Sequence, residues 1–151
     1  RDAGVEMVMA GHLAFPEIDP SELPASMSSV FLTDLLRDRM GFEGLIITDD
    51  IEMQGYPQGD DRKEAVITSS LAGIDLFAIG PSPQIQLEVL EALREGVESG
   101  RITEQRVDES LMRVIKAKMK LKVIPRYSLE EAREIFGSRE HKEAVSRLFE
   151  N

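Results

Sequence analysis

Three short apolar runs, each flanked by glycine, restrict the fold of this chain more than any other feature of its sequence. They are residues 7–10 (MVMA), 45–48 (LIIT) and 74–79 (IDLFAI). Apolar residues without alternation are typical of a strand that is covered on both faces, as in a parallel sheet. The neighbouring glycines and the valine and isoleucine content favour strands over pieces of helix.

Amphipathic patterns of helical period lie between and after these runs. The spacing predicts helices over residues 28–40, 62–73 and 84–99, and a further helix that starts at Thr103. Strands that alternate with helices indicate an α/β fold with a parallel sheet. Three strands are few for such a sheet, and both edges would be unpaired, so the pattern suggests further strands outside this chain.

The net charge of −10 comes entirely from the first half of the chain. Residues 1–80 contain 15 acidic and 5 basic side chains, whereas residues 81–151 contain 13 of each. An acidic half without a basic stripe repels phosphates, so we expect neither a nucleic acid nor an anionic membrane as partner. No apolar run approaches the roughly 18 residues that would span a bilayer. The absence of cysteine excludes disulfides but leaves a cytoplasmic and a secreted location both open.

A pair of carboxylates, Asp49 and Asp50, follows the second apolar run directly after Thr48. In α/β barrels the carboxyl ends of the strands line the active site. A carboxylate held there suits a nucleophile that attacks an electrophilic carbon. The alternative is that these side chains only cap the next turn. The carboxylates of Asp49, Asp50 and Glu52 could also be ligands of Mg²⁺ or Ca²⁺, but the ligand spacing of a known calcium loop is missing, so no metal is expected.

The sequence around these carboxylates resembles a known enzyme family. Residues 41–53 (GFEGLIITDDIEM) are similar to the nucleophile strand of glycoside hydrolase family 3, in its β-N-acetylhexosaminidase-like branch. Further similar stretches follow in the family's order, at residues 2–12 (DAGVEMVMAGH), 15–20 (FPEIDP), 24–28 (PASMS), 72–76 (AGIDL) and 99–110 (SGRITEQRVDES). Several ordered matches are much more specific than one short motif.

The resemblance implies a fold and a division of the chain. Residues 1–124 are expected to form the last strands and helices of a TIM-like (β/α)8 barrel, and therefore a partial parallel barrel. Residues 125–137 are expected to be a linker. Residues 138–151 are expected to begin a second domain, within a parent protein truncated at both ends.

The resemblance also implies a retaining glycosidase mechanism with Asp49 as the nucleophile. His12 and Met53 are expected to contact the sugar, while Thr48 and Asp50 are expected to support Asp49 from beside it. Thr48 is a candidate hydrogen-bond donor to the Asp49 carboxylate. No cofactor is expected, because two protein groups suffice for this reaction.

The expected substrates are carbohydrates with a terminal β-N-acetylglucosaminide. In the β-glucosidase and β-xylosidase branches an aromatic residue usually follows the nucleophile, so the Asp49-Asp50 pair favours the hexosaminidase branch. The family's acid–base group lies outside residues 1–151, so we expect the chain alone to have little or no glycosidase activity. A non-catalytic half-barrel that associates with a complementary half, or with itself, is the alternative from another class of function.

Overall fold

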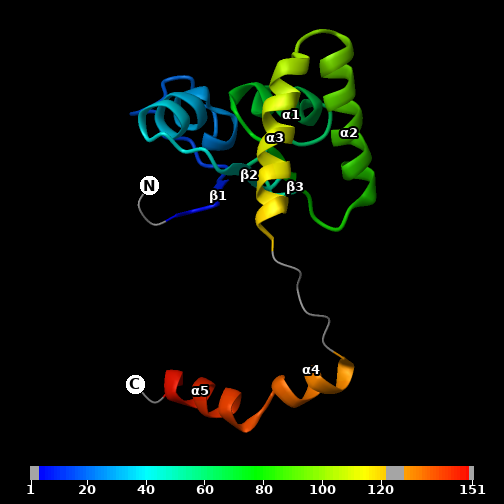
Figure 1. The fold of residues 1–151 in the computed structure, drawn as a ribbon. Coiled ribbons are helices and arrows are strands. Elements are labelled where there is room, and N and C mark those ends of the chain that lie inside the picture. Colours follow the sequence, from blue (N-terminus) through cyan, green and yellow to red (C-terminus); the bar gives the residue numbers. More distant parts are fainter. Residues whose placement is uncertain (1–3, 122–127, 150–151) are drawn as a thin grey trace. The chain divides into compact units, whose positions relative to one another are not determined.

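The computed structural model describes residues 4–121 and 128–149, which divide into two units on either side of residue 120. The first unit contains, in chain order (Figure 1), β1 (Met7–Ala10), η1 (Ala25–Met27), η2 (Val30–Arg39), β2 (Leu45–Asp50), α1 (Asp61–Ala72), β3 (Leu76–Ala78), α2 (Pro83–Glu98) and α3 (Glu104–Lys120). Within the described ranges no helix combines the length and apolarity needed to cross a bilayer.

The three strands form one parallel sheet in the order β1-β2-β3. This confirms the predicted α/β class, and the sheet is an open part of a barrel rather than a closed one. β3 is shorter than the predicted strand 74–79. Gly73 has a φ of 124° at the end of α1, and the Ile74 N–H bonds to the Ser69 carbonyl (3.1 Å), so residue 74 completes the helix end before the strand starts.

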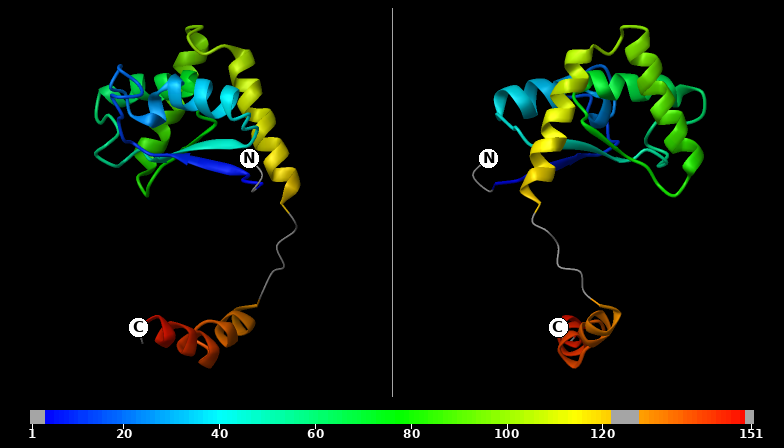
Figure 2. Two further views of the ribbon diagram at one scale, coloured as in Figure 1. Left: turned by 90° about the vertical axis from the view of Figure 1, so that its left-hand side faces the viewer. Right: turned by 45° about the vertical axis from the view of Figure 1, so that its right-hand side comes forward.

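One face of the sheet is covered by helices, and Figure 2 shows η2 and α1 on the same side of the strands. Ala10 and Ile46 of the strands pack there with Leu32 of η2 and Ala72 of α1. Ile46 is fully buried, with 0% of its surface exposed. Burial of an isoleucine side chain of this kind contributes about 1.5–3 kcal/mol, so this layer supplies much of the stability of the unit.

The opposite face of the sheet is open in the first unit. Met7 and Met9 are 45% and 62% exposed although they lie within β1. Met9 pairs with Ile47, and strand alternation places Asp49 on the same face as Ile47. In a complete (β/α)8 barrel one sheet face is turned inward and filled with side chains, so Asp49 lies on the face that a barrel would enclose.

The predicted helices 62–73 and 84–99, and the helix that starts at Thr103, are confirmed within a residue or two by α1, α2 and α3. The helix predicted over 28–40 is η2, which has the wider π winding, with the Met40 N–H bonded to the Leu35 carbonyl (2.9 Å). No contact in the structure explains this winding. Gly41 follows it with a φ of 63°, the left-handed conformation that glycine commonly adopts just after a helix.

The second unit contains α4 (Leu129–Ile135) and α5 (Arg139–Phe149). A capping box starts α4, because Ser128 and Glu131 each bond to the other's backbone N–H. α4 lies inside the predicted linker 125–137, and α5 lies in the predicted start of a second domain. The predicted boundary between residues 124 and 125 falls outside the described residues, so the division into domains stays a prediction.

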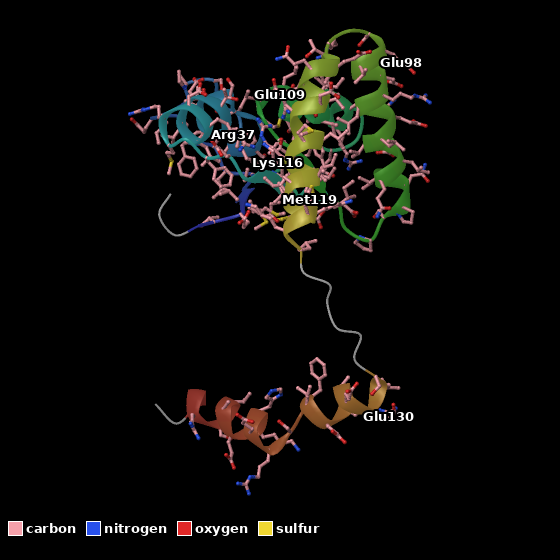
Figure 3. The ribbon with its side chains drawn as sticks, viewed as in Figure 1. Arg37, Glu98, Glu109, Lys116, Met119 and Glu130 are labelled. Atoms are coloured by element: carbon pink, nitrogen blue, oxygen red, sulfur yellow. The ribbon has the colours of Figure 1, made fainter. Side chains whose placement is uncertain are left out.

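A buried carboxylate at the start of β3 joins four parts of the first unit. Asp75 accepts hydrogen bonds at Oδ2 from Arg37 (2.6 Å) and the Ile46 N–H (3.0 Å), and at Oδ1 from Ser110 (2.6 Å) and Arg113 (3.0 Å). Its side chain is 0% exposed. Figure 3 shows Arg37 on η2 beside α3. Asp75 therefore ties β3 to β2, η2 and α3.

Replacing this carboxylate tests its role. Asp75→Ala should lower the free energy of unfolding by about 2–4 kcal/mol, because partly buried arginines then lose their counter-charge and the Ile46 N–H loses its acceptor. Denaturant unfolding followed by circular dichroism measures the loss. Asp38→Ala is the matched control, since Asp38 is an exposed acid beside Arg37, and it should change stability by less than about 0.5 kcal/mol. Equal effects of the two substitutions would contradict this role.

Candidate functional site

The ends of the three strands meet at one edge of the sheet, because the strands are parallel. His12 follows β1 and Asp49 and Asp50 end β2, while Gly80 and Ser82 follow β3. In α/β proteins this carboxyl edge is where ligands bind. The structure thus brings the predicted residues His12, Asp49 and Asp50 into one neighbourhood.

Asp49 has one carboxylate oxygen bound and one free. Its Oδ1 accepts a hydrogen bond from the backbone N–H of Asp50 (2.8 Å). Its Oδ2 has no hydrogen-bond partner among the described residues, and the side chain is only partly buried. A backbone N–H on a carboxylate oxygen stabilises the negative charge. One oxygen is therefore anchored while the other can approach a ligand from the open face of the sheet.

Asp50 connects the end of β2 to the loop after β3. Its Oδ1 accepts hydrogen bonds from the N–H groups of Gly80 (3.0 Å) and Glu52 (3.0 Å). Its carbonyl oxygen lies 3.2 Å from Nε2 of His12. Its Oδ2, like that of Asp49, has no hydrogen-bond partner among the described residues, and the predicted supporting role of Asp50 beside Asp49 stays a prediction.

His12 is held on both ring nitrogens. Nδ1 lies 2.8 Å from the hydroxyl of Ser26, and Nε2 bonds to the carbonyl of Asp50. The ring also packs on Tyr56, with 4.9 Å between the ring centroids and a tilt of 55°. The predicted contact between His12 and a sugar hydroxyl stays a prediction, and neither ring nitrogen is left without a protein partner.

Neither Thr48 nor Met53 has a described hydrogen bond to the Asp49 carboxylate. Thr48 is 0% exposed, and its hydroxyl accepts a hydrogen bond from the N–H of Ala78 (3.0 Å). By strand alternation it lies on the helix-covered face, opposite Asp49, and the expected bond between the two is not among the described contacts. Met53 is 49% exposed in the turn after β2. A side chain in this place can form a wall of a pocket only when another part of the protein or a ligand covers it.

Sequence reasoning missed several residues that shape the site. Ser26 and Tyr56 hold the His12 ring, and Ser82 binds the Glu52 carboxylate through its N–H (3.1 Å) and its hydroxyl (2.7 Å). The available signal was position for Tyr56, Gly80 and Ser82, because they lie in the segments directly after β2 and β3, whereas Ser26 lies in η1.

Gly80 is required by close packing. A Cβ atom there would lie 2.9 Å from Oδ2 of Asp50 and 2.9 Å from Oε1 of Glu52. Such distances are shorter than real carbon–oxygen contacts, so a larger residue must displace these carboxylates. Glycine thus allows the loop after β3 to approach the end of β2 closely.

The pKa of Tyr56 is raised from 10.0 to about 12, because burial disfavours the phenolate more than the nearby groups favour it. Tyr56 is 1% exposed, and its hydroxyl lies 3.0 Å from the hydroxyl of Ser69. Its neutral ring is therefore a fixed support for His12 throughout the physiological pH range.

No three acidic or histidine side chains within residues 4–121 and 128–149 gather in a way that could hold a metal ion. The Asp49, Asp50 and Glu52 carboxylates are instead bonded to backbone N–H groups and to Ser82. This edge therefore presents carboxylates with hydrogen-bonding neighbours, and Asp49 lies on the open face of the sheet.

Comparison with known proteins decides the family. The family model described as the glycosyl hydrolase family 3 N-terminal domain matches residues 2–117. The chain belongs to glycoside hydrolase family 3. The match includes β1, β2 and β3, and so contains the whole of the site described above.

Family 3 relatives with assigned names are similar to this chain over part of their length. A β-N-acetylglucosaminidase/β-glucosidase from Cellulomonas fimi is 34% identical over 128 residues, which is 79% of this chain and 22% of the relative. A solved β-N-acetylglucosaminidase from Paenibacillus sp. shares 32% identity with a TM-score of 0.82, covering 97% of this chain and 28% of that chain. A solved β-glucoside phosphorylase shares 32% identity with a TM-score of 0.79, covering 94% of this chain and 27% of that one. The chain thus spans between a fifth and a third of these proteins.

Gly80→Ala should lower the free energy of unfolding by about 0.5–1.5 kcal/mol, because the Asp50 and Glu52 carboxylates must shift and weaken their hydrogen bonds to the loop after β3. Gly11→Ala is the matched control at the same sheet edge, because a Cβ there meets no atom within 4 Å. Denaturant unfolding of both variants tests this, and a neutral Gly80→Ala would show that the loop after β3 is not held as described.

Stability should fall at high pH because of Tyr56. The unfolded chain releases the phenol proton near pH 10 and the folded chain near pH 12. The free energy of unfolding should therefore fall by up to about 2–3 kcal/mol as the pH rises through this window. Tyr56→Phe removes this contribution. Unfolding free energies of both proteins, measured from pH 9 to 12, should diverge in slope, and parallel curves would contradict the burial of the phenol.

Proposed function

We propose that this protein is a retaining glycosidase that cleaves terminal β-N-acetylglucosaminides, with Asp49 as its nucleophile. The observation that carries the proposal is the Asp49 carboxylate at the end of β2, with Oδ1 bound to the Asp50 N–H and Oδ2 free. Family membership supports a glycosidase, and the position at the carboxyl edge supports this particular residue.

The chemistry proceeds in two displacements. Oδ2 of Asp49 attacks the anomeric carbon, a carbon–oxygen ester bond forms, and the glycosidic bond breaks as its oxygen takes a proton from an acid. Water then attacks the same carbon, gives its proton to the conjugate base of that acid, and releases the Asp49 carboxylate. The first step starts from the Asp49 carboxylate, and the second step restores it. The hydrogen bond from the Asp50 N–H to Oδ1 stabilises this carboxylate.

No group that matches the family's proton donor is identified within residues 1–151, so we expect these residues alone to turn over substrate slowly or not at all. The exposed methionines of the open sheet face, Met7 and Met9, are consistent with a complementary part of a barrel covering that face. We expect activity from a half-barrel that has assembled with such a part or with a second copy.

A second candidate is a β-glucosidase activity at the same site. The Cellulomonas fimi relative has both β-N-acetylglucosaminidase and β-glucosidase in its name, and the solved β-glucoside phosphorylase is as similar to this chain as the solved β-N-acetylglucosaminidase is in sequence identity, at 32% each. The Asp49–Asp50 pair favours the N-acetylglucosaminide. A comparison of glucosyl and N-acetylglucosaminyl reagents, with and without inorganic phosphate, separates these activities.

The nucleophile is tested with a 5-fluoro N-acetylglucosaminyl fluoride. The fluoride leaves without a proton, so the missing acid is not required for trapping, and the fluorine on the ring slows hydrolysis of the ester. Mass spectrometry should find the sugar on the peptide that contains Asp49, and Asp49→Ala should reduce this adduct at least a hundredfold.

Asp38→Ala, an exposed acid of η2, is the matched control and should be labelled like the wild type. A folded chain that forms no adduct would contradict assembly of the nucleophile site within these residues. An adduct that persists in Asp49→Ala would assign the nucleophile to another carboxylate.

A further inference from the structure

We infer that His12 is a positioning residue that fixes the Asp49 carboxylate through Asp50, and that it does so without binding the sugar. The inference rests on the proposed role of Asp49 as nucleophile. The position of His12 at the carboxyl edge suggested a contact with the sugar, and the role inferred here differs from that expectation.

The hydrogen-bond partners of His12 determine its tautomer. The Asp50 carbonyl can only accept, so Nε2 of His12 carries the proton and donates it across 3.2 Å. In the neutral ring Nδ1 is then an acceptor, and the Ser26 hydroxyl donates to it across 2.8 Å. Ser26 is 0% exposed, so no solvent competes for its hydroxyl. Both polar atoms of the ring are therefore used by the protein.

His12 also has packing contacts with Tyr56 and Gly55. Tyr56 packs on the imidazole at 4.9 Å between centroids. Gly55 lies so close that a Cβ atom there would be 2.9 Å from Cβ and from the carbonyl oxygen of His12. The turn after β2 thus folds back on the residue after β1, and the imidazole is held in one orientation.

The effect of His12 reaches Asp49 through both peptide groups of Asp50. The carbonyl of Asp50 is bound by His12, and its N–H is bound to Oδ1 of Asp49. The next N–H, of Ile51, bonds to the Ala78 carbonyl (3.1 Å). With both flanking peptide planes fixed, the backbone of Asp50 has one conformation, and the Asp49 carboxylate keeps the orientation that leaves Oδ2 free.

The consequence for catalysis is specific. A residue that touches a sugar hydroxyl contributes less to the rate of ester formation when that hydroxyl is missing. A positioning residue affects the rate of attack on every sugar equally. Loss of the His12 hydrogen bonds should therefore slow ester formation by about tenfold, the change that one lost hydrogen bond of ordinary strength gives. The slowing should be the same for reagents that lack any one hydroxyl.

The first test measures Asp49 itself in the chain, without any turnover. Three-bond NMR couplings report whether Asp49 χ1 has one rotamer, and amide exchange reports the protection of Asp50 and Ile51. Wild type should show one rotamer. His12→Phe, which keeps a ring against Tyr56, and Ser26→Ala, which cannot touch a sugar, should both show averaged couplings and exchange about tenfold faster at these amides.

His12→Gln is the conservative variant, because its amide can still donate to the Asp50 carbonyl, and it should restore much of the order. His141→Phe, at the other histidine of the chain and on an exposed position of α5, is the matched control and should leave Asp49 unchanged. Unfolding midpoints of all variants are compared, so that a general loss of stability is recognised. An ordered Asp49 in a folded His12→Phe protein overturns the inference.

The second test uses the fluoride reagent described above together with its 3-, 4- and 6-deoxy analogues. Equal slowing by His12→Phe across the series supports positioning. Slowing that disappears with one analogue would show that His12 binds that hydroxyl, and overturns the inference. Labelling that persists in Asp49→Ala contradicts the proposed nucleophile instead. The NMR experiment tests the effect of His12 on Asp49 independently of that outcome.

Discussion

The buried carboxylate of Asp75 holds the amino ends of β2 and β3, and the position of these strands relative to η2 and α3 depends on it. It bonds directly to β2 through the Ile46 N–H, to η2 through Arg37, and to α3 through Ser110 and Arg113. A buried charge of this kind is stable only with complete partners, which makes the arrangement of these elements specific. A parallel sheet that is fixed at its amino end presents its carboxyl ends in a fixed relation to one another.

At the carboxyl edge the contacts are of another kind, since short hydrogen-bonded loops replace the ion cluster. The Asp50 side chain and the Glu52 carboxylate bind the loop after β3, and His12 binds the Asp50 carbonyl. Among the described contacts, Oδ2 of Asp49 and Oδ2 of Asp50 have no hydrogen-bond partner in the protein, and strand alternation places only Asp49 on the open face of the sheet. Support from several loops around one reactive group is the usual construction of a site on a rigid scaffold.

The sequence predicted the strands, most helices and the neighbourhood of Asp49, because apolar runs, helical periods and ordered motifs are local properties. It did not predict that Thr48 bonds to Ala78 rather than toward Asp49, that β3 starts at residue 76, or that three arginines surround Asp75. These features depend on which residues meet across the sheet. Ser26 and Tyr56 were missed for the same reason, since their roles arise only where they meet the His12 ring.

The most direct test of the account is a crystal structure of the protein after reaction with the fluoride reagent. The account predicts a bond between the anomeric carbon of the sugar and Oδ2 of Asp49, with Oδ1 still bound to the Asp50 N–H and with the His12 ring unmoved. A sugar attached to Asp50 or Glu52, or one that reaches Asp49 only after its bond to the Asp50 N–H has broken, would contradict it.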